Sequence, residues 1–174
     1  MRLRPLILLA AATLVASPLA AQSPVQLSLL NPAQLVPERE SVSGVRLSVL
    51  YTKNANVEVV DLGLGFNHTT GNGFGVQWAL VSMVGGTFTG WQSGLVSITR
   101  HRLVGLQTGA YTSAPDGQGV QFGRVNTAKS WNGLQLGLVN FTERMSGGGL
   151  QIGIVNIIKQ GGVAPMLPIV NFTF

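Results

Sequence analysis

An eight-residue phrase recurs along most of this chain, and its repetition constrains the fold more than any other feature of the sequence. The clearest copies are GLQTGAYT at 105–112, GVQFGRVN at 119–126, GLQLGLVN at 133–140 and GLQIGIVN at 149–156. More divergent copies begin at Gly44, Val59, Gly75 and Gly90, and successive copies start 14 to 16 residues apart. A worn ninth copy, APMLPIVN, begins at Ala164. A constant period of this length indicates one structural unit repeated in tandem.

The N-terminus has the composition of a secretory signal peptide. Arg2 and Arg4 precede an apolar run over 6–15, and small residues lead up to Gln22. The apolar run is shorter than the roughly 20 residues that a membrane-spanning helix needs. We therefore expect residues 1–21 to be removed on export, residues 22–43 to lead into the repeats, and residues 44–174 to form one repeat-built β domain.

Composition excludes several classes of function. The chain has no cysteine, which excludes disulfides, thiolate chemistry and a lipid anchor on a cysteine. Its 174 residues carry 11 Lys and Arg and 6 Asp and Glu, so the charges are few and form no basic stripe. Nucleic-acid binding needs a concentrated basic surface, and we expect none.

The pattern inside each phrase predicts a β-strand. With the first residue of a copy numbered +0, positions +1, +3 and +5 are mostly Val, Leu or Ile, whereas +0, +2 and +4 are mostly Gly, Gln and Gly. Alternation with period two is typical of a strand with two unlike faces, and two glycines per unit disfavour a helix. Between the phrases lie residues that favour chain reversal, at 70–73, 85–86, 115–117 and 146–148.

Two architectures could use such a unit. A parallel β-solenoid would stack glutamine on glutamine, and would likewise stack Asn126, Asn140 and Asn156. Against it, eight extended residues span about 26 Å, and the six to eight that remain cannot turn twice and return that distance. We therefore predict a closed or nearly closed antiparallel up-and-down β-barrel of about nine strand-turn repeats, because closure removes exposed sheet edges. The parallel β-solenoid is the alternative.

Whether such a barrel would span a membrane is a separate question. A signal peptide, even strand spacing and the alternating C-terminal run that ends at Phe174 are typical of outer-membrane barrels. The apolar stripe, however, covers only about 13 Å of the roughly 25 Å apolar band of such a barrel. Ser93, Thr108 and Arg124 also interrupt the apolar positions.

The phrases GLQLGLVN and GLQIGIVN, with the ending PIVNFTF, resemble the bacterial surface-repeat proteins that carry tandem GLQIGLVN-type units after a signal peptide. The resemblance covers about residues 25–174. It implies a secreted or envelope-associated protein with the shape of a shallow, flower-like β-barrel. It implies no catalytic residues.

Candidate chemistry is sparse. His68 and His101 are the only histidines, and each is expected to be a solvated turn residue. We find no metal-ligand spacing and no nucleophile motif, and we expect no catalytic, metal or cofactor site. Arg46 and Asp61 both occupy position +2 of neighbouring copies, and we predict that they form a structural ion pair.

These observations favour a non-enzymatic exported envelope or surface protein that acts as a structural or binding module. Membrane or lipid is the expected partner, and an apolar cavity would hold a lipid if the Val, Leu and Ile side chains faced inward. The alternative is an integral outer-membrane barrel with those side chains outward. In either case the glutamines at +2 are the candidates for a lumen lining or a partner face: Gln77, Gln92, Gln107, Gln121, Gln135 and Gln151.

Overall fold

A computed structural model describes residues 22–31 and 33–174 of the chain, and the expected signal peptide lies outside the described residues. The described part is built from strands and contains no helix. The strands are β1 (Gln22–Leu30), β2 (Ala33–Gln34), β3 (Ser41–Asn54), β4 (Val57–Gly63), β5 (Phe66–Thr69), β6 (Gly73–Trp78), β7 (Val81–Val84), β8 (Thr87–Ser93), β9 (Val96–Thr99), β10 (Arg102–Leu136), β11 (Val139–Gln160) and β12 (Met166–Phe172).

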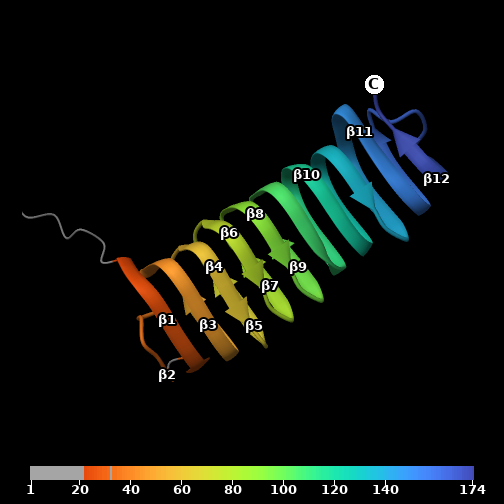
Figure 1. Ribbon diagram of the computed structural model, residues 1–174. Helices are drawn as coiled ribbons and strands as arrows, with labels where there is room; N and C mark the ends of the chain where they lie inside the picture. Colours follow the sequence, from red (N-terminus) through yellow and green to blue (C-terminus); the bar gives the residue numbers. More distant parts are fainter. Residues whose placement is uncertain (1–21, 32) are drawn as a thin grey trace, which may run out of the picture.

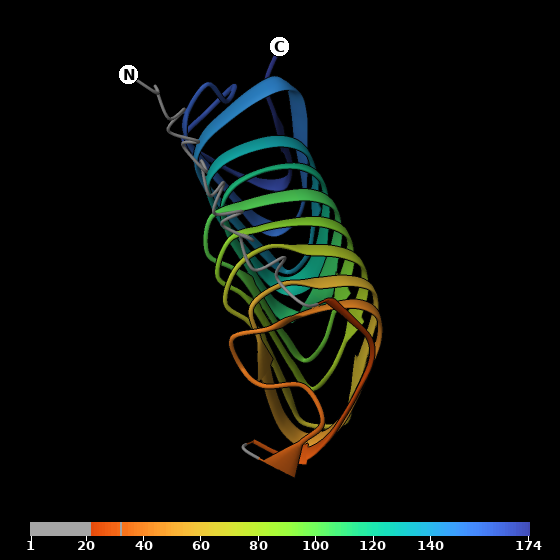
Figure 2. The same cartoon turned by 90° about the vertical axis from the view of Figure 1, so that its left-hand side faces the viewer.

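The strands form a parallel β-solenoid of about nine turns, in which each of the first eight copies of the repeat makes one turn, here called a rung (Figures 1 and 2). Equivalent residues of successive rungs pair in parallel register, as Asp61 does with Gln77 and Gln77 does with Gln92. The prediction of a closed antiparallel barrel is therefore wrong, and the solenoid is the observed fold. The integral barrel that depended on antiparallel closure has no counterpart in this structure.

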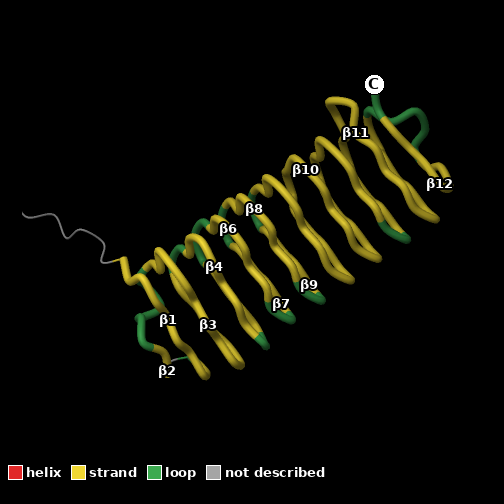
Figure 3. Tube along the Cα trace, viewed as in Figure 1, coloured by secondary structure: helices red, strands yellow, loops and turns green. Residues whose placement is uncertain are grey.

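The barrel prediction failed because the eight-residue phrase is not one straight strand. The chain bends at positions +4 and +5, which we call the corner, and the strands are interrupted there at 79–80, 94–95 and 137–138 (Figure 3). One part of the phrase lies on a first face (β4, β6 and β8) and the rest on a second face (β5, β7 and β9). Three sides of about five residues, each about 16 Å long, are enough to complete a turn.

The alternation of inward and outward residues also changes phase at the corner. In the rung that begins at Gly75, the buried residues are Gln77 and Ala79 up to the bend, and Ser82 and Val84 after it. Positions +5 and +6 therefore both point away from the interior. The +1, +3 and +5 side chains lie on the outside of the coil, so the interior is not the apolar cavity that we considered.

Two kinds of side chain fill the interior. The glutamines at +2 and a column of Thr, Asn and Ser on the second face are buried along the length of the coil. Apolar residues gather instead beside the connecting side, which is the third side of each rung and links the second face to the next rung. The larger of the two buried apolar clusters contains Val84, Phe88, Leu103, Ala114, Ala128, Trp131, Met145 and Ile158.

The two ends of the coil differ. At the N-terminal end β1 lies parallel to β3, with Gln26 opposite Arg46, and therefore adds a rung ahead of the first recognisable phrase. At the C-terminal end the ninth copy turns back as β12 and pairs antiparallel with β11, with Asn171 opposite Gln151 (Figure 1). A reversed last strand covers a sheet edge that would otherwise be open to pairing.

Glycine at +0 is required where the first face approaches the preceding rung. Gly105 has a φ of 126°, which side-chain-bearing residues rarely adopt, and a Cβ built on it would overlap the carbonyl oxygen of Gly90. A Cβ built on Gly90 would likewise overlap the carbonyl oxygen of Gly75, and one built on Gly119 that of Gly105. This column of glycines therefore sets the close approach of backbone to backbone between rungs.

We expect Gly105→Ala to lower the free energy of unfolding by about 3 kcal/mol, because the new methyl group meets fixed backbone and the φ is unfavourable. The matched control is Gly148→Ala, where φ is 74° but no atom lies within 4 Å of the built Cβ. The control should lower the free energy of unfolding by only about 1 kcal/mol, which is the loss from the unfavourable φ alone. Urea denaturation measures both, and equal losses would show that close approach contributes nothing.

Candidate functional site

The +2 residues of the first two phrases form an ion pair. Arg46 and Asp61 face each other in adjacent rungs, and both are buried. Arg46 Nε donates to Asp61 Oδ1 at 2.6 Å, and Arg46 Nη2 contacts Asp61 Oδ2. Asn67 Nδ2 and Gln77 Nε2 each donate to one of the carboxylate oxygens at 2.7 Å. Because every oxygen of the carboxylate has two donors, the buried charge is well compensated.

The glutamine column continues from this carboxylate as a ladder of hydrogen bonds. Gln92 Nε2 donates to Gln77 Oε1 at 2.8 Å, and the same bond joins each later glutamine to the one before it at 2.6–2.9 Å. All the amide groups therefore point their positive ends toward Asp61. The ladder ends at Gln151, whose Oε1 has no partner among the described residues.

A second ladder runs along the second face with the opposite direction. Thr112 Oγ1 donates to Asn126 Oδ1 at 2.6 Å. Asn126 Nδ2 then donates to Asn140 Oδ1, and Asn140 Nδ2 to Asn156 Oδ1, each at 2.7 Å. These amides point their positive ends toward the C-terminus. The two ladders thus oppose each other's dipoles across the interior.

The ladders decide where the candidate glutamines lie. All six are at most 2 % exposed, and their amides bond to one another or to Asp61. They therefore belong to the packed interior, and present no free face to a partner. The structure brings Arg46 and Asp61 together, but places the glutamines where no ligand reaches them.

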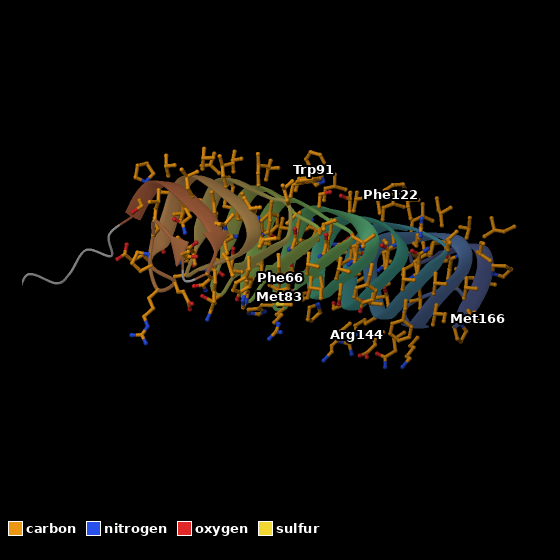
Figure 4. All side chains as sticks on the ribbon, turned by 90° about the horizontal axis from the view of Figure 1, so that it is seen from below. Phe66, Met83, Trp91, Phe122, Arg144 and Met166 are labelled. Atoms are coloured by element: carbon orange, nitrogen blue, oxygen red, sulfur yellow. The ribbon has the colours of Figure 1, made fainter. Side chains whose placement is uncertain are left out.

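The outside of the coil carries the apolar residues instead. Figure 4 shows carbon-rich side chains, including Trp91 and Phe122, along one long side of the coil. The +5 side chains at the corner protrude most: Leu64, Leu80, Leu95, Leu138 and Ile154 are 50–66 % exposed. Other exposed members of the first face are Leu47, Leu62, Phe74, Trp78, Trp91, Phe122 and Ile152.

Charged side chains concentrate away from this apolar surface, as Arg144 does on the opposite side in Figure 4. Among the described +1, +3 and +5 positions, Arg124 is the one charged residue. The connecting side carries most of the charges of the later rungs: Arg100, Arg102, Asp116, Lys129, Glu143, Arg144 and Lys159. The coil is therefore amphipathic across its section, with an apolar corner and a charged connecting side.

The corner is hollowed over the middle rungs. A depression of about 610 Å³ follows the small residues at +4. Its walls include Leu95, Phe122 and Leu138, and Arg124 also lines it. A second depression of about 390 Å³ shares Leu138 and continues toward Ile169 of β12. Arg124 interrupts the apolar stripe of the sequence, but nothing in the period-two pattern indicates a hollow.

The remaining candidates for chemistry are the histidines and the carboxylates. No group of three or more His, Asp or Glu in residues 22–31 and 33–174 is arranged to hold a metal ion. His68 is not a solvated turn residue, because it lies in β5 beside Phe66. Burial, then the nearby Lys53 and Arg100, keep the pKa of His68 below its usual value. His101 is exposed.

Fold and surface together define a parallel β-solenoid with a polar interior and an apolar outer corner. No family model, curated protein or solved structure matches this chain. The described residues include no helix long and apolar enough to cross a membrane.

We expect Arg46→Gln to lower the free energy of unfolding by about 3–5 kcal/mol, because it leaves the Asp61 carboxylate buried without its counter-charge. The double variant Arg46→Gln/Asp61→Gln extends the amide ladder by two neutral members. Its free energy of unfolding should lie within about 1 kcal/mol of that of the parent chain. Chemical denaturation of the single and double variants measures the coupling, and a double variant no more stable than Arg46→Gln would contradict this account.

Proposed function

We propose that this chain is a non-enzymatic, exported envelope protein that docks on a lipid surface through the corner between its two outer faces. The observation that carries the proposal is the inverted polarity of the coil, with buried amides inside and exposed Leu, Ile, Trp and Phe outside. The amide ladders and the apolar cluster beside the connecting side already fill the interior, so these exposed apolar side chains do not contribute to its packing.

The size of the apolar surface supports a docking role. Strands β4, β6 and β8 have 6 or 7 residues each, so over about nine rungs the whole first face, with its Gly, Ser, Thr and Glu58 positions included, measures about 20 Å by 40 Å, or roughly 800 Å². The largest apolar patch on a typical monomeric protein is about 300–600 Å². Leu47, Leu62, Trp78, Trp91 and Phe122 make the apolar part of this face comparable with such a patch, and patches of that size favour contact with an apolar phase.

The backbone of the corner is also suited to an apolar environment. Gly94 N donates to Thr108 O at 3.1 Å, and Leu138 N donates to Arg124 O at 2.9 Å. The hydrogen bonds between rungs thus continue through the bend, where the strands are interrupted. An unpaired peptide group costs several kcal/mol in hydrocarbon, so a paired corner can enter lipid where an open loop cannot.

The charges lie where a docked coil would meet water and headgroups. With the corner immersed, the cations of the connecting side lie farthest from the hydrocarbon. The basic, apolar and small-residue order of residues 1–21 and the resemblance to the surface-repeat family support export to the envelope.

We expect the mature chain to float with phosphatidylcholine vesicles in a density gradient. The triple variant Leu80→Gln, Leu95→Gln and Leu138→Gln should bind about 100-fold more weakly, because each of these leucines contributes about 1 kcal/mol when half of its surface leaves water. Its stability should be nearly unchanged, since all three side chains are exposed in the free protein.

The matched control alters three exposed connecting-side residues, as His101→Gln, Ser146→Gln and Gln160→Asn. This variant should bind vesicles like the parent chain. If the parent chain forms a dimer that the leucine variant disrupts, and neither binds vesicles, a second copy covers the corner and the lipid proposal is wrong.

A further inference from the structure

Arg124 occupies an unusual position on the apolar corner. It takes position +5 in its rung, between Ala110 and Leu138 in the adjacent rungs. No carboxylate of the described residues forms a salt bridge with it. A lone charge immersed among apolar side chains is unfavourable unless an opposite charge accompanies it. If the corner enters lipid, Arg124 therefore needs an anion from outside the chain.

The same depression contains a short run of polar side chains. Trp91 Nε1 donates to Thr108 Oγ1 at 3.2 Å, and Thr108 Oγ1 donates to Ser93 Oγ at 2.8 Å. The hydroxyl proton of Ser93 has no acceptor in the hydrogen bonds of residues 22–31 and 33–174. Ser93, Thr108 and Arg124 all line the 610 Å³ depression. The depression thus offers a guanidinium and a hydroxyl donor, and no anionic group.

The rest of the lining is apolar. Leu95, Phe122 and Leu138 form its walls, and the floor is backbone of the small residues at +4. A volume of this size lies in the range of small-molecule sites, and apolar walls with a few polar donors fix the orientation of a ligand. An occupant that satisfies both parts has an anionic head and a hydrocarbon chain.

We propose that the depression at Arg124 binds the phosphate headgroup of an anionic lipid, with Arg124 and Ser93 on its oxygens and an acyl chain along Leu95, Phe122 and Leu138. This rests on the proposed function, and adds selectivity for the headgroup to it. A guanidinium matches two phosphate oxygens at once, which an isolated ammonium group does not. A zwitterionic lipid brings its own cation to the depression, and so gains less from Arg124.

The test compares vesicles of phosphatidylcholine alone with vesicles that also contain phosphatidylglycerol. Binding is measured in about 0.5 M salt, where the Debye length is roughly 4 Å and exposed cations are largely screened. The parent chain should prefer the anionic vesicles by about tenfold. Arg124→Gln should bind both kinds equally, and as strongly as the parent chain binds phosphatidylcholine.

Lys129→Gln is the matched control, since it removes one exposed cation from the connecting side. It should keep the preference for anionic vesicles. The inference is overturned if Arg124→Gln retains the preference, or if Lys129→Gln loses it equally. A parent chain that binds neither kind of vesicle would overturn the proposed function itself. Binding equally to both kinds would leave docking intact and overturn only the headgroup site.

A further arm separates a lipid from a free anion. Inorganic phosphate is added at constant ionic strength, with chloride withdrawn to match. If the acyl chain supplies much of the affinity, millimolar phosphate should not displace the parent chain from anionic vesicles. Displacement at that concentration would mean that the depression recognises the anion alone. Thermal unfolding of Arg124→Gln should match the parent chain, because the Arg124 side chain is exposed.

Discussion

Hydrogen bonds between equivalent side chains of neighbouring rungs are the interaction on which the rest of this structure depends. A buried amide is unfavourable when it is unpaired. In a parallel coil, however, the side-chain amide of each glutamine lies within hydrogen-bond distance of the equivalent glutamine in the next rung. Gln107, for example, donates to Gln92 and accepts from Gln121. The register of the whole stack is therefore specified from inside, since a slip by one residue would leave every amide without a partner.

The polar interior has a consequence for the surface. In a strand, alternate side chains point to opposite faces. Because the amide side chains point inward, the side chains at +1, +3 and +5 must point outward. The Val, Leu and Ile residues are left on the outside, where the corner makes them protrude. The exposed apolar surface on which the proposed docking rests is thus a direct result of how the amides inside the coil are paired. The coil is also asymmetric, because most of the charges of the later rungs lie on the connecting side, away from the apolar corner.

Much of the local structure could be predicted from the sequence. Strands with turn residues between them, a repeat of constant length and the pairing of Arg46 with Asp61 all follow from residue types and spacing. The barrel prediction was wrong because it treated phrases such as GVQWALVS at 75–82 as one straight strand. Leu80 and Val81 are two apolar residues in succession, and they mark the change of phase where the chain bends. Ala79 and the glycines at +4 permit the bend, because a larger side chain there would meet backbone or the interior.

The sequence by itself determined the repeating unit, its all-β character and the two unlike sets of side chains, because each depends only on neighbours along the chain. Only the tertiary structure decided which set is buried. That choice depends on the direction of adjacent strands: parallel stacking sets Gln77 against Gln92 and satisfies both amides, whereas no single phrase contains the partner of its own glutamine. The hollow at Arg124 also depends on the tertiary structure, because residues of four successive rungs line it.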